Sequence, residues 1–231
     1  MSWDRLLWGI EFSSKDGHRD APMLIRRKQS LNLYDVVLAD PPWHFNNFSA
    51  DKPGMLHDRS RGANRYYVTA TTDDICNLVP PAKDDSVLFL WACWPMLPDA
   101  MRVISAWGFE YKTLAWVWVK ANKTGFGFFT GMGYYTRSNS EPCLLATRGN
   151  LPKPANRSIQ ALIYSPIRQH SRKPDEQYVK IEKLYPDANY LEMFARHRRQ
   201  KWDVFGNEVE GSISLLPSNN GLHPTPEKRR G

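Results

Sequence analysis

The sequence contains little cysteine. In 231 residues it has three, Cys76, Cys93 and Cys143. They are widely spaced and form no C-x-x-C pair, which excludes a disulfide framework and a cysteine-rich zinc cluster. The histidines show no metal-ligand spacing either, so we expect no bound metal. This cysteine usage is typical of a protein in a reducing cytoplasm.

Long hydrophobic runs are also missing. The opening stretch, MSWDRLLWGIEFSS, is interrupted by Asp4, Arg5 and Glu11, so we expect no signal peptide there. No other run approaches the length needed to cross a bilayer. We therefore expect a cytoplasmic protein that does not associate with a membrane.

The composition suits a folded domain that binds a polyanion. Hydrophobic residues make up 42% of the chain, which is enough for a substantial core, and the length suits one domain with modest extensions. Aromatic residues reach 13%, with nine tryptophans, which would suit a site that stacks planar rings, although most such rings lie in protein cores. The formal charge of +7 favours encounter with nucleic acid or another anionic surface.

Short apolar runs alternate with amphipathic segments. Buried strands are predicted over residues 34–40, 86–92, 111–120, 143–147, 161–164 and 189–194. Helices are predicted after the capping sequence at 71–74, over 98–107 and after Pro174. This alternation predicts an α/β fold with a mostly parallel sheet. Ligands of such sheets gather at the carboxyl ends of the strands, where Asp40 and Arg196 are expected.

The tetrapeptide Asp40-Pro41-Pro42-Trp43, directly after the first buried strand, is the sharpest feature. The exocyclic amine of adenine is a poor nucleophile because its lone pair is delocalised into the ring. A carboxylate and a backbone carbonyl can each accept one amine hydrogen and stabilise a pyramidal nitrogen as it attacks a methyl group. Asp40 would supply the carboxylate and Pro41 the carbonyl, on a backbone that Pro42 stiffens. Trp43 would offer a flat surface to the base.

A bare Asp-Pro-Pro can also be a turn that ends a strand beside a buried tryptophan. The preceding β-branched run and the aromatic-rich sequence beyond favour catalysis. The methyl group of a sulfonium cofactor is already activated, so the chemistry needs positioning and hydrogen bonding rather than a metal.

The chain resembles the DPPW family of adenine methyltransferases, which includes the catalytic subunit of the eukaryotic messenger-RNA adenosine methyltransferase and many bacterial and phage relatives. Several motifs in order carry the resemblance, and they are closest to those of the compact bacterial and phage members. In chain order they are DPPW, Tyr66-Tyr67, Thr71 to Asp74, FLWA, WVWVK ending at Lys120, TGMGY at 130–134, NSEPCLL at 139–145, SRKPDE at 171–176, EMFAR at 192–196, Trp202 and GNE at 206–208.

The resemblance implies a Rossmann-like methyltransferase fold in which the catalytic strand comes early and the cofactor strand late. It also implies S-adenosyl-L-methionine as the methyl donor. The implied cofactor-binding residues are Asp40, Lys173, Phe194, Arg196, Asn207 and Glu208. The residues implied for the target adenosine are Trp43, Tyr67 and Glu141. On this basis we assign residues 1–30 to an N-terminal extension, 31–209 to the methyltransferase domain and 210–231 to a flexible C-terminal tail.

Most of these positions also have a structural interpretation. Lys173 could be a solvated lysine, Arg196 could begin a solvated basic turn, and Asn207 could belong to a simple turn. Tyr67 and Glu141 could equally serve the fold.

The polymer that accepts the methyl group is the main open choice. DNA is preferred, because the resemblance is greatest to compact prokaryotic and phage members and the sequence carries no zinc finger or similar RNA-binding module. RNA methylation by the same chemistry is the alternative, and transfer to the amine of cytosine is a further one. A different class of function is a non-catalytic nucleic-acid-binding subunit, against which the intact DPPW argues. The sequence does not predict an oligomeric state.

Overall fold

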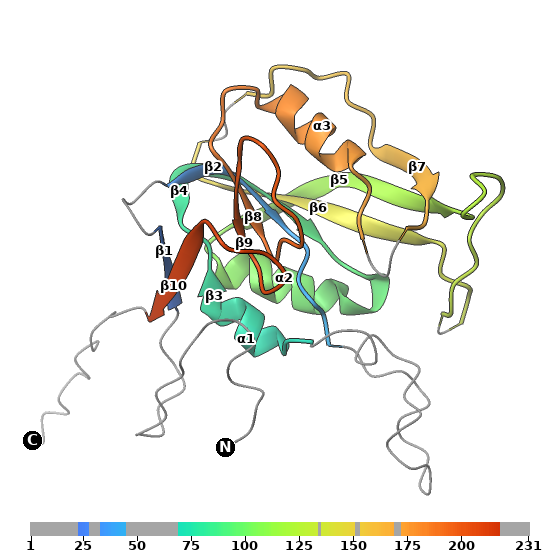
Figure 1. Cartoon of the computed structure of the whole chain (residues 1–231), viewed down its shortest axis with the longest axis horizontal. Helices are drawn as coiled ribbons and strands as arrows, with labels where there is room; N and C mark the ends of the chain where they lie inside the picture. The colour runs from blue at the N-terminus through green and yellow to red at the C-terminus, as the bar shows by residue number, and fades with distance from the viewer. Residues whose placement is uncertain are drawn as a thin grey trace, which may run out of the picture.

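A computed structural model describes residues 23–27, 33–44, 69–133, 135–150, 153–168 and 172–217. Its main sheet has seven strands in the order β7-β5-β6-β4-β2-β8-β9 (Figure 1). The strands are β2 (Tyr34–Ala39), β4 (Ala82–Trp91), β5 (Glu110–Ala121), β6 (Ser140–Arg148), β7 (Leu162–Pro166), β8 (Tyr190–Met193) and β9 (Trp202–Phe205). The helices are α1 (Thr72–Asn77), α2 (Leu97–Ala106) and α3 (Glu176–Leu184), with a 3-10 helix at Trp94–Met96.

The sheet is mostly parallel. The pairs β2–β4, β2–β8, β8–β9 and β5–β7 are parallel, whereas β6 is antiparallel to both of its neighbours. The early strand β2 lies directly beside the late strand β8, so segments more than 150 residues apart in the chain are neighbours in the sheet. This confirms the predicted Rossmann-like α/β fold, with the catalytic strand early and the cofactor strand late.

Alternate side chains of the central strands enter two cores on opposite faces of the sheet. Val37 and Leu88 belong to the core that contains residues of α1 and α2, and Leu38 and Phe89 to the core that contains Ile181 of α3. Figure 1 shows α3 on one side of the sheet and α1 and α2 on the other. This period of two is what a strand buried on both faces requires.

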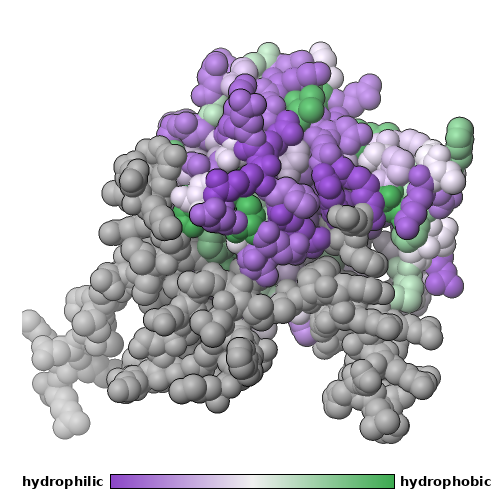
Figure 2. All heavy atoms as spheres, viewed as in Figure 1, coloured by the Kyte–Doolittle hydropathy of each residue, from purple (hydrophilic) through white to green (hydrophobic). Residues whose placement is uncertain are grey.

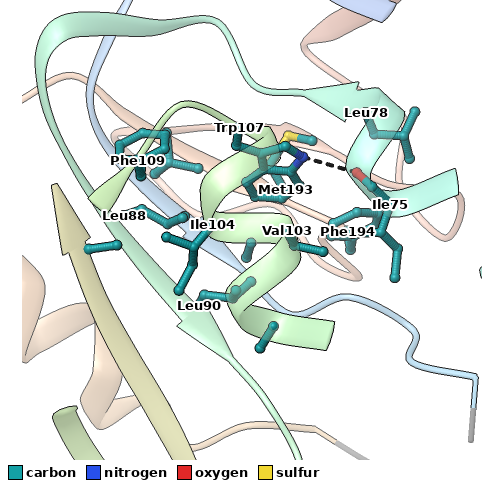
Figure 3. Packing of buried hydrophobic residues seen from close by; sticks show 14 of the residues in the cluster. Ile75, Leu78, Leu88, Leu90, Val103, Ile104, Trp107, Phe109, Met193 and Phe194 are labelled. Carbon is teal, nitrogen blue, oxygen red and sulfur yellow. Dashed lines mark hydrogen bonds between the residues drawn. The ribbon is translucent and has the colours of Figure 1, made fainter. Parts of the chain in front are cut away.

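A buried hydrogen bond ties α1 to the end of α2. The indole nitrogen of Trp107 donates to the backbone carbonyl of Ile75 at 2.9 Å (Figure 3). Thr71 caps α1 as its sequence predicts, because its hydroxyl accepts from the backbone nitrogen of Asp74, whose carboxylate accepts from the Thr71 backbone in return. Within the described residues, no helix is long and apolar enough to span a membrane.

A second, three-stranded sheet differs from the sequence expectation. Its order is β10-β1-β3, with β1 at Met23–Arg27, β3 at Leu78–Val79 and β10 at Ile213–Pro217. β1 and β10 pair antiparallel over their full lengths. Residues 213–217 were expected in a flexible tail and 23–27 in an extension without assigned structure, and here they form neighbouring strands. The outer bounds of the methyltransferase domain remain a prediction.

Candidate active site

The tetrapeptide at the end of β2 forms a tight, hydrogen-bonded corner. The Trp43 backbone nitrogen donates to the Pro41 carbonyl at 2.9 Å, which closes a γ-turn around Pro42. The Pro42 carbonyl accepts from the Ala70 nitrogen, also at 2.9 Å. The corner therefore has a fixed backbone, and the Pro41 carbonyl keeps a second lone pair for another donor.

Trp43 packs into the core at this corner. Its side chain belongs to the core that contains α1 and α2, and the residue is 6% exposed. Its indole nitrogen donates to the Trp91 carbonyl at the end of β4, at 3.0 Å. These contacts fix the position of the tetrapeptide, and stacking of a base on Trp43 would require the ring to become more exposed. The stacking role remains a prediction.

Four side chains of alternating charge, from four different strand and loop segments, contact one another in a row beside the corner that follows β2. The Lys173 ammonium lies 2.8 and 2.9 Å from the two carboxylate oxygens of Asp40. The same ammonium lies 3.3 Å from one oxygen of Glu141, whose other oxygen accepts from Lys120 at 2.5 Å. Lys173 also lies over the ring of Trp91, 5.5 Å from its centroid. The structure thus brings together Asp40, Lys173 and Glu141, which the resemblance had implied for the cofactor and the target base, and their binding roles remain a prediction.

The two carboxylates in this chain differ in proton affinity. Burial raises the pKa of Asp40 above its ordinary value, although the ammonium of Lys173 opposes the rise. Burial would raise the pKa of Glu141 as well, but Lys173 and Lys120 together outweigh it and hold this pKa below its usual range. Glu141 is therefore the carboxylate that stays ionised, and Asp40 is the one that takes up a proton more readily.

A hollow opens between the ends of β2 and β8 and the start of α3. Its lining includes four of the predicted site residues, Asp40, Lys173, Phe194 and Arg196. The other lining residues are Leu38, Arg172, Asp175, Gln177, Tyr178, Glu192, His197, Arg198 and Arg199. Negative and positive side chains thus face the same space. Figure 2 shows the strongly hydrophilic surface of this part of the molecule.

Glu192 is the most informative of the lining residues that sequence reasoning missed. It is 9% exposed, and one of its carboxylate oxygens accepts from the Tyr178 hydroxyl at 2.9 Å. The other oxygen, Oε2, is buried with no hydrogen-bond partner. Burial raises the pKa of Glu192 to about 7. A buried acceptor beside a hollow indicates a place where a ligand donates a hydrogen bond.

The turn after β8 holds two of the predicted cofactor residues. Phe194 has φ of 62°, a left-handed conformation that costs energy for a bulky side chain and is common at binding sites. Gly206 lies against this turn, where a Cβ atom would come within 2.0 Å of the Ala195 carbonyl oxygen. The close packing of these two backbones keeps Phe194 and Arg196 at the wall of the hollow.

The other predicted contacts lie elsewhere. Asn207 and Glu208 are exposed, and neither lines the hollow. Glu208 reaches the site only through Arg196, whose Nε lies 3.6 Å from its carboxylate. Glu141 contacts Lys173 without lining the hollow, and Tyr67 lies outside the described residues. Among the described residues, no cluster of histidine, cysteine and acidic side chains could hold a metal ion.

The chain is similar to known methyltransferases along most of its length. The chain is 30% identical over 213 residues to the type II methyltransferase M.MunI of Mycoplasma sp, and this alignment covers 87% of this chain and 86% of that protein. It is 32% identical over 192 residues to the N(6)-adenosine-methyltransferase catalytic subunit METTL3 of Homo sapiens, which covers 81% of this chain and 30% of that protein. It is 31% identical over 200 residues to an N(6)-adenosine-methyltransferase MT-A70-like protein of Arabidopsis thaliana, which covers 85% of this chain and 26% of that protein. The MT-A70 family profile matches residues 34–208, from the first strand of the main sheet to the turn after its last, and the chain belongs to the MT-A70 family.

Proposed function

We propose that this S-adenosylmethionine-dependent adenine methyltransferase acts on DNA, and that Asp40 and the Pro41 carbonyl receive the exocyclic amine of the target base. The observation that carries the proposal is the placement of the Asp40 carboxylate. It stands at the end of β2, a quarter exposed to the hollow, and Lys173 fixes both of its oxygens. A hydrogen-bonded proline corner follows it directly.

The donor set of the hollow fits the cofactor. S-adenosylmethionine supplies a methyl group on a sulfonium, together with an ammonium, a carboxylate and ribose hydroxyls. The carboxyl groups of Asp40 and Glu192 offer acceptors for its ammonium and hydroxyl groups, and the partnerless Oε2 of Glu192 is a buried acceptor that such a donor would satisfy. Lys173 and Arg196 are cations suited to its carboxylate and hydroxyls.

Asp40 can serve Lys173 and the amine together. A carboxylate offers about four lone-pair positions, so two contacts with one ammonium leave room for an amine hydrogen. A second amine hydrogen would go to the free lone pair of the Pro41 carbonyl. These two acceptors favour the pyramidal nitrogen in which the lone pair is available for attack.

The amine must also lose a proton. When the bond between the amine nitrogen and the methyl carbon forms, the bond from that carbon to sulfur breaks, and the nitrogen releases one hydrogen. The raised pKa of Asp40 suits it to accept this proton and pass it to solvent, while Glu141 stays ionised and retains Lys173.

The similarity to a type II methyltransferase along nearly its whole length supports DNA rather than RNA as the polymer. The chain spans 86% of the compact type II methyltransferase M.MunI. It spans only 30% of human METTL3, whose name specifies adenosine. The RNA alternative assigns the same roles to the same residues, so the polymer is decided by experiment.

The test supplies the purified chain with methyl-labelled cofactor and either unmethylated DNA or total RNA, followed by mass spectrometry of the nucleosides. We expect N6-methyladenine in DNA. Asp40→Asn should lower the transfer rate on the order of a hundredfold or more, because it removes the anionic acceptor. The control is Glu110→Gln, which changes an exposed acid at the far end of β5. If label appears only in RNA, the substrate is RNA and not DNA. Full activity of Asp40→Asn would refute the catalytic assignment.

A further inference from the structure

A tight turn in the loop between β5 and β6 presents Phe126 to solvent. Gly125 and Gly127 on either side have φ of 83° and 69°, which only glycine adopts at little cost. Asn122 holds the turn closed, because its backbone nitrogen donates to the Gly127 carbonyl and its side-chain amide to the Phe126 carbonyl, each at 3.1 Å. Phe126 is nevertheless 83% exposed. The turn therefore has a defined conformation that displays an aromatic ring.

Two more rings stand beside it. Phe128 is 61% exposed and packs edge-to-face against Tyr164 of β7, with 5.9 Å between ring centroids. The Tyr164 hydroxyl donates to the Gly127 carbonyl at 3.3 Å, which ties β7 to the turn. We call Phe126, Phe128 and Tyr164 the aromatic platform.

The aromatic platform begins at the catalytic edge of the sheet. The loop leaves β5 immediately after Lys120 and Ala121 and returns to β6 just before Glu141. Lys120 and Glu141 contact each other at 2.5 Å, and Glu141 reaches Lys173. A polymer that presents one base to Asp40 would therefore pass close to this loop.

Charge narrows the class of partner. The sequence has no acidic residue between Glu110 and Glu141, and the loop carries Lys123 and Arg137, both exposed. Exposed aromatic rings held together on a defined turn indicate a surface that a binding partner covers. A partner that offers both negative charge and flat rings is a nucleic acid strand with unstacked bases.

We propose that the aromatic platform stacks the bases that flank the target adenine. This inference rests on the proposed function and extends it to recognition of the neighbouring nucleotides. Bases inside a duplex have both faces covered by stacking, so the strand must be locally unstacked when it contacts the platform, as it is around a flipped-out base.

The test combines Phe126→Ala and Phe128→Ala in the full chain and uses a short oligonucleotide of whichever polymer the wild-type chain methylates. We expect the affinity measured by fluorescence anisotropy to fall about tenfold or more, and KM for the oligonucleotide to rise in parallel. The kcat and the affinity for S-adenosylmethionine should not change. Phe126→Tyr should keep the wild-type values, and Tyr111→Ala, an exposed aromatic at the opposite end of β5, is the matched control.

An abasic nucleotide next to the target adenine gives a second readout. Removing this base should lower the oligonucleotide affinity of the wild type strongly and that of the double variant only slightly, because the flanking base and the platform rings form one contact. If wild-type methylation is intact but the double variant binds and turns over the oligonucleotide normally, the platform proposal is wrong and the proposed function stands. If the wild type methylates no polymer, the proposed function itself fails. If the double variant only dissociates a dimer in analytical ultracentrifugation, the platform covers a second copy instead.

Discussion

Replacement of Glu192 by glutamine should change how the stability of the protein depends on pH. In the folded chain the pKa of Glu192 is about 7, against an ordinary value of 4.5. Because the folded pKa is raised, the native state retains a proton that the unfolded chain has already lost between these two values. The stability of the wild type should therefore fall as pH rises from about 4.5 through about 7, and this loss should level off above that range.

The size of the effect follows from the same two values. A tenfold change in proton affinity corresponds to about 1.4 kcal/mol, so the raised pKa amounts to roughly 3 kcal/mol in the free energy of unfolding. Glu192→Gln is neutral at every pH and escapes this loss. Its stability relative to the wild type should therefore rise by roughly that amount between acidic and mildly alkaline solution.

Urea denaturation of both proteins without cofactor, at a series of pH values, measures the difference directly. Glu182→Gln is the contrasting control. Burial would raise the pKa of Glu182, but its hydrogen bonds from Arg199 and Trp202 prevail and lower it, so its stabilising contribution is lost as pH falls. A Glu192→Gln difference that stays constant with pH, or that reverses sign, would refute the account of a buried, partly unsatisfied carboxyl.

Two further perturbations test the catalytic edge and the turn after β8. Lys173→Met removes the ammonium that opposes the raised pKa of Asp40, so at saturating cofactor the transfer rate should fall on the order of a hundredfold and recover in part at higher pH, which a pH profile of kcat measures. Gly206→Ala should lower the free energy of unfolding by about 2–4 kcal/mol in urea, because the new methyl group meets the Ala195 carbonyl. Gly211→Ala, where the nearest atom is 3.1 Å away, should cost clearly less, and equal losses would contradict the packing argument.

Local patterns were enough to predict six of the seven strands of the main sheet and the position of Asp40, whereas β9 (Trp202–Phe205) was not predicted. The apolar run from Tyr34 ends at two prolines, and the structure ends β2 at Ala39, just before Asp40. The direction of β6 could not be predicted, because an apolar run reads the same for a parallel or an antiparallel strand. The pairing of β1 with β10 joins short segments from opposite parts of the chain, and local sequence does not specify such a partner.

The candidate site was only partly accessible from sequence. Residue patterns alone indicated Asp40, and resemblance was needed to associate it with Lys173 and Glu141. Glu192 left a usable signal, because a carboxylate inside the predicted strand 189–194 is a charge in an otherwise buried segment. Its importance depends on an oxygen without a partner, which is a property of the folded packing.

If the aromatic platform contacts the flanking bases as proposed, the antiparallel direction of β6 places target choice and target chemistry on separate segments. Because β5 ends and the antiparallel β6 begins at the same end of the sheet, the segment from 122 to 139 is a loop that leaves and rejoins the sheet next to Lys120 and Glu141. Exchanging that loop would leave the register of β5 with β6 and the corner after β2 unchanged. Under the platform proposal, a new nucleotide preference could then be introduced by exchanging this segment, with the residues around Asp40 left unaltered.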